Sequence, residues 1–203
     1  MILKFGILGG TFNPIHNGHI TVALKVRELL NLDKIFLMPN KIPPHKNLDE
    51  VLKEEMRLNM IELCANEFEF LDVEKCELKK QKVSYTYESL EYLDRIHKGD
   101  ELFFIIGSDS FLNFNEWQKI DRIFRSSNVV VYLRDLEHEK RIIEMKKYYE
   151  DVYDAKIFSF MLSNTFGISS TKIRKMVSEG KDVSSLVPKC VNEYIIFENL
   201  YRK

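Results

Sequence analysis

Short apolar runs alternate with longer segments of helical periodicity along this chain, and this alternation constrains the fold more than any other feature of the sequence. Buried strands are expected at 3–8, 34–38, 102–106, 128–133 and 156–160, with one or two short strands within 68–78. Helices are expected at 18–30, 51–66, 87–97, 136–149, 170–178 and 188–200. We therefore predict an α/β, Rossmann-like doubly wound and mainly parallel sheet with helices on both faces.

We expect the 203 residues to form one domain, in which the closing helices, from about residue 170, make a C-terminal helical part. The helix at 51–66 is expected to present Leu52, Met56, Met60 and Leu63 as its apolar face. Doubly wound sheets bind ligands outside the carboxyl ends of their strands. Three segments directly follow a predicted strand, namely 9–19, 39–46 and 107–109.

The charge balance limits the kind of partner that this chain can bind. Lys and Arg number 30 and Asp and Glu number 31, which argues against a broad basic surface for nucleic acid. Any bound anion must then be met by a few local donors. The three cysteines are odd in number and form no C-x-x-C pair, so we expect reduced core thiols and a cytoplasmic protein. No apolar run is long enough for a membrane span, and no secretory signal is visible.

The segment 9–19, which reads GGTFNPIHNGH, combines paired glycines with two histidines at the start of a helix. Glycine lets the backbone approach a ligand closely, and a helix N-terminus favours phosphate. His16 and His19 are three residues apart and share a helix face, where both can donate to phosphoryl oxygens. A single histidine here could simply cap the helix or face solvent. A zinc site would need a third ligand, such as His45, and the segment lacks carboxylates and cysteines nearby.

The segment 168–174, which reads ISSTKIR, contains a second group of donors. Its hydroxyl residues are expected to cap the helix that follows, with Arg174 on the solvated face. The same arrangement could equally bind an anion, because it offers donors and no acidic groups.

These two segments resemble the G-G-[ST]-F-[DN]-P-x-H-x-G-H and I-S-S-T-x-I-R signatures of the nucleotidylyltransferase superfamily. Between them the sequence is similar to the bacterial nicotinate-nucleotide adenylyltransferases, through PNKIPPHK at 39–46, SYT at 84–86 and IGSD at 106–109 with Trp117. The resemblance covers essentially the whole chain in order. It implies transfer of the AMP moiety of ATP to nicotinate mononucleotide by direct in-line attack, with Mg²⁺ carried by ATP and no metal ligand from the protein.

The resemblance also implies a role for individual residues. His16, His19 and Arg174 would be catalytic, with His19 contacting the α-phosphate in the transition state. ATP would be bound by Gly9, Gly10, Thr11, Ile106, Gly107, Asp109, Ser169, Ser170 and Thr171. The mononucleotide would be bound by Asn40, His45, Lys46, Thr86, Trp117 and Arg134.

Several of these assignments have a plainer alternative. Asp109 could be a helix N-cap, Lys46 a solvated side chain on a loop, and Trp117 a packing residue. Two positions depart from the family pattern. Arg134 is followed by Asp-Leu where many relatives have Pro-Gly, and Asn13 stands where bacterial relatives often have Asp. We expect Asn13 mainly to hold the turn.

Other functions are open at this point. The same chemistry could act on nicotinamide mononucleotide or phosphopantetheine, although the pieces around Asn40, Thr86 and Trp117 argue against the latter. A non-catalytic nucleotide sensor would need a damaged motif, and a nucleic-acid-binding module has only the α/β topology in its favour. The sequence leaves open whether the chain forms a homo-oligomer, and whether the loop at 39–48 closes on substrate.

Overall fold

The computed structural model describes residues 1–41, 51–80, 85–133, 137–162 and 167–202. Within these ranges one sheet of six strands has the order β3-β2-β1-β4-β5-β6. Its strands are β1 (Lys4–Gly10), β2 (Lys34–Pro39), β3 (Leu71–Val73), β4 (Glu101–Gly107), β5 (Asn128–Leu133) and β6 (Ile157–Met161). Every neighbouring pair is parallel, so the predicted doubly wound architecture is confirmed. β1 and β4 are adjacent at the centre, where the strand order reverses.

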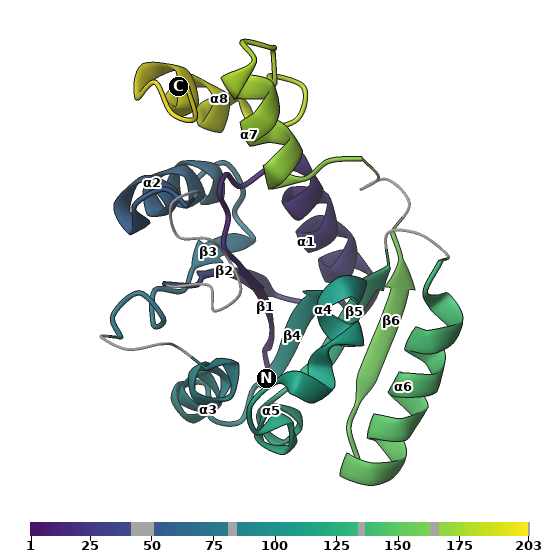
Figure 1. The fold of residues 1–203 in the computed structure, drawn as a ribbon. Helices are drawn as coiled ribbons and strands as arrows, with labels where there is room; N and C mark the ends of the chain where they lie inside the picture. The colour runs from purple at the N-terminus through teal and green to yellow at the C-terminus, as the bar shows by residue number, and fades with distance from the viewer. Residues whose placement is uncertain (42–50, 81–84, 134–136, 163–166, 203) are drawn as a thin grey trace.

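Helices cover both faces of this sheet (Figure 1). They are α1 (Asn17–Leu30), α2 (Glu54–Ala65), α3 (Thr86–Ile96), α4 (Ser108–Leu112), the 3-10 turn η2 (Phe114–Glu116), α5 (Ile120–Ser126), α6 (Glu139–Tyr153), α7 (Ser170–Ser178) and α8 (Lys189–Phe197). Strand β4 shows how the two cores arise. Phe103 and Ile105 pack with α1, α2, α7 and α8, whereas Phe104 and Ile106 pack with α3 to α6. This alternation explains why the strand is apolar at every internal position.

Helix α2 differs from the expectation in the face that it buries. Leu63 was predicted to be buried and is 39% exposed, while Arg57 is only 1% exposed. The buried positions are 57, 60, 61, 64 and 65, which lie on one side of a 3.6-residue repeat. Periodicity located the helix and correctly placed Met60 in the core, with Leu52 and Met56 packed against it. It was wrong for Leu63 and gave no reason to expect Arg57 there, because an arginine is seldom buried.

Smaller differences occur at element ends. Only β3 forms within 68–78, α6 continues to Tyr153, and Pro188 is the N-cap of α8 rather than part of its first turn. Part of the loop expected at 39–48 lies outside the described residues. None of the described helices is both long and apolar enough to cross a bilayer.

The C-terminal helices α7 and α8 lie beside α1 and α2 (Figure 1). The Asn17 N–H donates to the Leu186 carbonyl at 2.9 Å, and the Asn17 side chain donates to the Ser185 carbonyl at 3.1 Å. Asn59 of α2 donates to the Tyr194 hydroxyl of α8 at 3.0 Å. The C-terminal part therefore packs against the helix that carries the histidine pair.

The three cysteines are free thiols, and their burial differs. Cys64 is fully buried, as expected, whereas Cys76 and Cys190 are half-buried. Burial raises the pKa of Cys64 and Cys76 to about 12 and that of Cys190 to about 11. All three are therefore protonated and weakly nucleophilic at neutral pH.

Candidate active site

The loop between β1 and α1 is shaped by a close approach of Phe12 to Gly10. A Cβ on Gly10 would lie 3.0 Å from the Phe12 ring, so a larger residue would require the ring to move. Phe12 itself has a left-handed backbone with φ of 47° and is buried. Its ring meets the His19 ring edge-on at a centroid distance of 5.0 Å. The apolar residue of the motif thus supports one of the two histidines.

The two histidines form a stacked pair at the start of α1. His16 is the N-cap, and its ring centroid lies 3.7 Å from that of His19. The His16 backbone N–H donates to Nδ1 of His19 at 3.2 Å. Because Nδ1 accepts, a neutral His19 ring carries its proton on Nε2, which is the donor that a phosphoryl oxygen requires. The predicted shared face of the two rings is confirmed.

Gly18 provides the space for this pair. A Cβ at this position would lie 3.0 Å from two atoms of the His16 ring and 3.7 Å from Cβ of Ile168. The second contact also shows how closely the α1 start approaches the segment before α7. The glycine between the histidines therefore leaves room for the His16 ring, whereas the contact with Ile168 is at an ordinary van der Waals distance.

The start of α7 contacts the β1–α1 loop directly, which brings the two sequence motifs together. Ser170 Oγ donates to the Pro14 carbonyl at 2.8 Å, across 156 positions of the chain. Arg174 Nη1 donates to the Asn13 carbonyl at 3.1 Å. Ser169 is the N-cap, since its Oγ accepts from the Lys172 N–H at 3.2 Å. The predicted capping role is confirmed for Ser169, at the N-terminus of a nine-residue helix. The Ser170 hydroxyl bonds to the β1–α1 loop instead, and Arg174 is half-buried against that loop rather than on a solvated face.

Asn13 accepts hydrogen bonds from two distant segments. Its Oδ1 accepts from the Leu52 N–H at 3.3 Å and from the Tyr201 hydroxyl at 3.0 Å. Burial raises the pKa of Tyr201, which keeps this hydroxyl protonated as a donor. An uncharged amide oxygen is sufficient for both bonds. These contacts agree with the expectation that Asn13 holds the turn.

The end of β2 lies beside the same loop. The Asn40 N–H donates to the Gly10 carbonyl at 3.0 Å, and Asn40 Nδ2 donates to Thr11 Oγ1 at 3.3 Å. Two of the three strand ends expected to form the site are therefore in contact. His45 and Lys46, further along that loop, lie outside the described residues, as does Arg134.

The third strand end belongs to β4, which neighbours β1. Gly107 is the N-cap of α4, and Asp109 follows in the first turn, exposed to solvent. The alternative of Asp109 as the N-cap is therefore wrong, and its carboxylate is accessible. A Cβ on Gly107 would lie 3.2 Å from the Tyr132 ring, which explains the glycine. Ile106 is 5% exposed and packs in the core, so only its backbone can meet a ligand.

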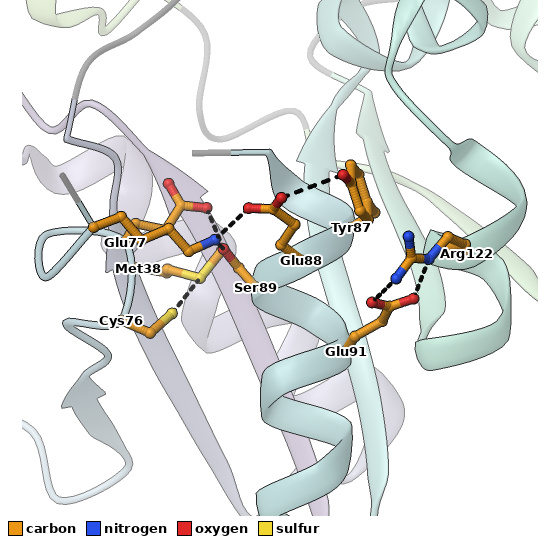
Figure 2. Close-up of polar contacts among 9 residues, drawn as sticks. Met38, Cys76, Glu77, Tyr87, Glu88, Ser89, Glu91 and Arg122 are labelled. Atoms are coloured by element: carbon orange, nitrogen blue, oxygen red, sulfur yellow. Dashed lines mark hydrogen bonds and ion pairs between the residues drawn. The ribbon is translucent and has the colours of Figure 1, made fainter. Parts of the chain in front are cut away.

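Thr86 is the first residue of α3, where the N–H groups have no acceptor within the helix. Residues 77–80 are held against α3 by a polar network (Figure 2). Ser89 Oγ donates to Glu77 Oε1 at 3.0 Å, and Lys80 Nζ contacts both Glu88 and Ser89. The segment 77–80 is thereby fixed on the first two turns of α3.

Trp117 is half-buried and follows η2. Its ring lies 5.0 Å from that of Phe114 and 6.1 Å from that of Phe104. The packing alternative therefore accounts for one side of the indole. Stacking of the other side on a pyridine ring stays a prediction.

Arg57 is the site residue that sequence reasoning missed. Its guanidinium donates to the carbonyls of Thr11 at 2.7 Å, Lys41 at 3.2 Å and Leu52 at 3.3 Å. Burial lowers the pKa of this arginine, and the neighbouring Glu54 and Tyr201 oppose that shift. No sequence signal could have pointed to backbone carbonyls as its partners.

Comparison with known proteins places these motifs in a family. Residues 7–176 match the cytidylyltransferase-like family model. A protein of Clostridium perfringens (strain 13 / Type A), named "Probable nicotinate-nucleotide adenylyltransferase", is 37% identical over 200 residues, covering 98% of each chain. A Streptococcus pyogenes serotype M3 protein of the same name is 37% identical over 199 residues, covering 98% of this chain and 89% of its own.

Solved structures share the fold. The Plasmodium falciparum nicotinic acid mononucleotide adenylyltransferase complexed with NaAD aligns with a TM-score of 0.78 at 20% identity, covering 98% of this chain and 97% of that one. The same enzyme complexed with APC aligns with a TM-score of 0.76 over the same shares of the two chains. The chain belongs to the cytidylyltransferase-like family, and within it to the nicotinate-nucleotide adenylyltransferases.

Proposed function

We propose that this chain transfers the AMP moiety of ATP to nicotinate mononucleotide, forming nicotinate adenine dinucleotide and releasing pyrophosphate. The observation that carries this proposal is the meeting of two donor-rich segments at the central strand ends. The stacked histidines of α1 and the hydroxyl and arginine donors of α7 are joined by the bonds to Pro14 and Asn13. The family to which the chain belongs agrees with this activity.

The reaction requires alignment more than proton transfer. A phosphomonoester is already an anion at neutral pH, so it can attack the α-phosphorus directly without a general base. The barrier then comes mainly from repulsion between anions and from the need for in-line geometry. Donors held in place before the reaction reduce both contributions.

On the ATP side, His19 is proposed to donate from Nε2 to the α-phosphate as charge develops there. His16 supports this ring by stacking at 3.7 Å and by its backbone N–H. Arg174 and the α7 hydroxyl residues, Ser169 to Thr171, are proposed to hold the β- and γ-phosphates, aided by the helix N-terminus. Gly9, Gly10 and Thr11 would approach the phosphates from the β1–α1 loop.

The adenosine is proposed to lie at the end of β4. Ile106 and Gly107 would contribute backbone groups, and the exposed Asp109 carboxylate would accept from the ribose hydroxyls. The switch in strand order between β1 and β4 is where such ligands bind in doubly wound sheets.

The mononucleotide is proposed to lie between the end of β2 and the start of α3. Asn40, His45 and Lys46 would hold its phosphate, and the Thr86 N–H would donate to the nicotinate carboxylate. A site that offers only donors favours the acid over the amide. Trp117 would stack on the pyridine ring, and Arg134 stays a candidate contact.

Mg²⁺ is proposed to arrive on the ATP phosphates rather than in a protein cage. The donor set described above consists of imidazoles, hydroxyl groups and a guanidinium, which suit phosphate oxygens. In the described part of the chain, no group of three or more His, Cys, Asp or Glu side chains could hold a metal ion. When bound, the ion neutralises charge on the triphosphate.

We further propose that the chain acts as one domain in the cytoplasm, on small-molecule substrates and without nucleic-acid or membrane partners. A homo-oligomer remains compatible with this proposal. The nearly balanced charge agrees with a site for small anions rather than for a polyanion.

A panel of acceptors tests the activity. The purified protein is incubated with Mg-ATP and, separately, with nicotinate mononucleotide, nicotinamide mononucleotide and phosphopantetheine, and pyrophosphate release is measured. We expect the highest kcat/KM with nicotinate mononucleotide. Equal or greater release with phosphopantetheine would refute the assignment. ATP binding without pyrophosphate release for any acceptor would indicate a sensor instead.

A further inference from the structure

Arg57 is a buried cation with an unusual set of partners. Its side chain is 1% exposed, yet within the described residues its hydrogen bonds all go to backbone carbonyl oxygens. Burying a guanidinium costs solvation, and an apolar side chain of similar volume would often be at least as stabilising. The presence of arginine therefore calls for a reason beyond core packing.

The three carbonyls belong to segments with different proposed roles. Thr11 lies in the β1–α1 loop, next to the triphosphate donors. Lys41 follows Asn40 at the end of β2, on the mononucleotide side. Leu52 precedes α2, and its own N–H donates to Asn13 Oδ1 of the first loop. One planar guanidinium thus contacts both segments that are proposed to bind substrate.

The bond lengths indicate that the contact is specific. The Thr11 carbonyl is reached at 2.7 Å and the Lys41 carbonyl at 3.2 Å, through two different terminal nitrogens of the same group. Because the guanidinium is rigid and planar, it fixes the directions of its donors relative to one another. A lysine has one terminal nitrogen and cannot replace this fork. The cation is also bonded directly to a loop that is proposed to receive a polyphosphate.

We propose that Arg57 is a positioning residue that sets the spacing between the ATP-binding loop and the mononucleotide-binding segment. This inference rests on the proposed function, because it assigns the two substrates to these segments. A fixed spacing holds the acceptor phosphate and the α-phosphate at the reactive separation. Each substrate alone contacts mainly one segment, so its binding depends little on that spacing. A ligand that spans both segments depends on it strongly.

Two Arg57 variants and a matched control test this inference. Arg57→Met removes the fork, and Arg57→Lys keeps the charge but not the geometry. Ile61→Ala is the control, since Ile61 is fully buried on the same helix and belongs to the hydrophobic core. The measurements are kcat, the KM of each substrate, the Kd of nicotinate adenine dinucleotide by calorimetry, and the unfolding transition. Assays are run where every variant is at least nine-tenths folded.

We expect both Arg57 variants to lower kcat and to weaken binding of the dinucleotide by about tenfold or more, which is a change of about 1.4 kcal/mol. The KM of each single substrate should change by less than about threefold, which is about half of a tenfold change on a logarithmic scale. Ile61→Ala should lose stability with dinucleotide affinity unchanged. If Arg57→Met does not fold, Arg57→Lys decides the outcome alone.

Two results would overturn the inference. One is dinucleotide affinity and kcat in Arg57→Lys that match the unsubstituted protein. The other is a loss in the Arg57 variants no larger than in Ile61→Ala at equal folded fraction, which would make the role purely structural. If the unsubstituted protein neither binds the dinucleotide nor releases pyrophosphate, the proposed function fails, and this inference fails with it.

Discussion

Removing the Tyr201 hydroxyl should weaken the hold on the β1–α1 loop by a predictable amount. The hydroxyl donates to Asn13 Oδ1 at 3.0 Å, and Tyr201→Phe deletes this bond while keeping the ring. Asn13 Oδ1 keeps its second donor, the Leu52 N–H at 3.3 Å, so no buried acceptor is left without a partner. The expected loss in unfolding free energy is therefore that of one neutral hydrogen bond, about 0.5–1.5 kcal/mol.

Asn13→Ala should cost more, because it removes the acceptor and leaves the two donors behind. Asn13 is 2% exposed, and a buried polar group left unpaired costs about 1–3 kcal/mol. In the double variant the two losses should not add. The coupling free energy should be about 1 kcal/mol, as for residues in direct contact.

Urea unfolding, followed by circular dichroism and by fluorescence of the single tryptophan, measures both quantities. The midpoint should fall with an unchanged denaturant slope, and Tm should fall by roughly 2–4 °C per kcal/mol for a chain of this size. Tyr92→Phe is the control, since the Tyr92 side chain is 38% exposed. A coupling free energy indistinguishable from zero would refute the reasoning, even if both single variants were destabilised.

Four further predictions concern the histidine pair, Asn13 and the core. Gly18→Ala should lower kcat, because the new Cβ would lie 3.0 Å from the His16 ring. Its effect on the unfolding free energy should be small, since alanine favours a helix over glycine by about 1 kcal/mol. An unchanged kcat would contradict the role of the stacked pair. His19→Ala should lower kcat by roughly a hundredfold or more, as for loss of a transition-state donor, with a smaller change in the unfolding free energy. Asn13→Asp should retain activity, since a carboxylate oxygen can accept the same two hydrogen bonds. The Cys64 thiol binds its proton more tightly in the folded state, where its pKa is about 12, than at its ordinary pKa of 9.0. Its contribution to stability is therefore constant below pH 9 and is lost as pH rises toward 12. In Cys64→Ala the unfolding free energy should fall less steeply between pH 9 and 12, and an identical slope would count against the pKa shift.

Much of the fold follows from local pattern. The strand at 128–133 and the helix at 170–178 have the predicted bounds, because a continuous apolar run and a serine N-cap are short-range signals. The histidine pair is equally local, since its geometry depends on a three-residue spacing on one helix. The contact between the 9–19 and 168–174 segments is different, because its hydrogen bonds span 156 and 161 positions of the chain. Resemblance alone assigned both segments to ATP, and it did not predict that they touch.

Arg57 shows what local pattern cannot provide. Its burial depends on carbonyls up to 46 positions away, and a backbone carbonyl is present at every residue. Because arginine is seldom buried, local pattern gave no reason to place Arg57 in the core, and it included the exposed Leu63 in the apolar face of α2. Asp109 is a similar case, because the cap of α4 is the preceding glycine and nothing in the sequence distinguishes the two.

The bonds that return to the β1–α1 loop have a consequence for the order of synthesis. Asn13 is made early, but its partner Tyr201 is added 188 positions later, which at about 5–20 residues per second takes roughly 10–40 s. Ser170 and Arg174 also reach this loop only after most of the sheet has been translated. A nascent chain can thus carry the histidine motif for many seconds before the motif is held in place. A chain released before residue 201 would contain every proposed catalytic residue and still lack the finished loop.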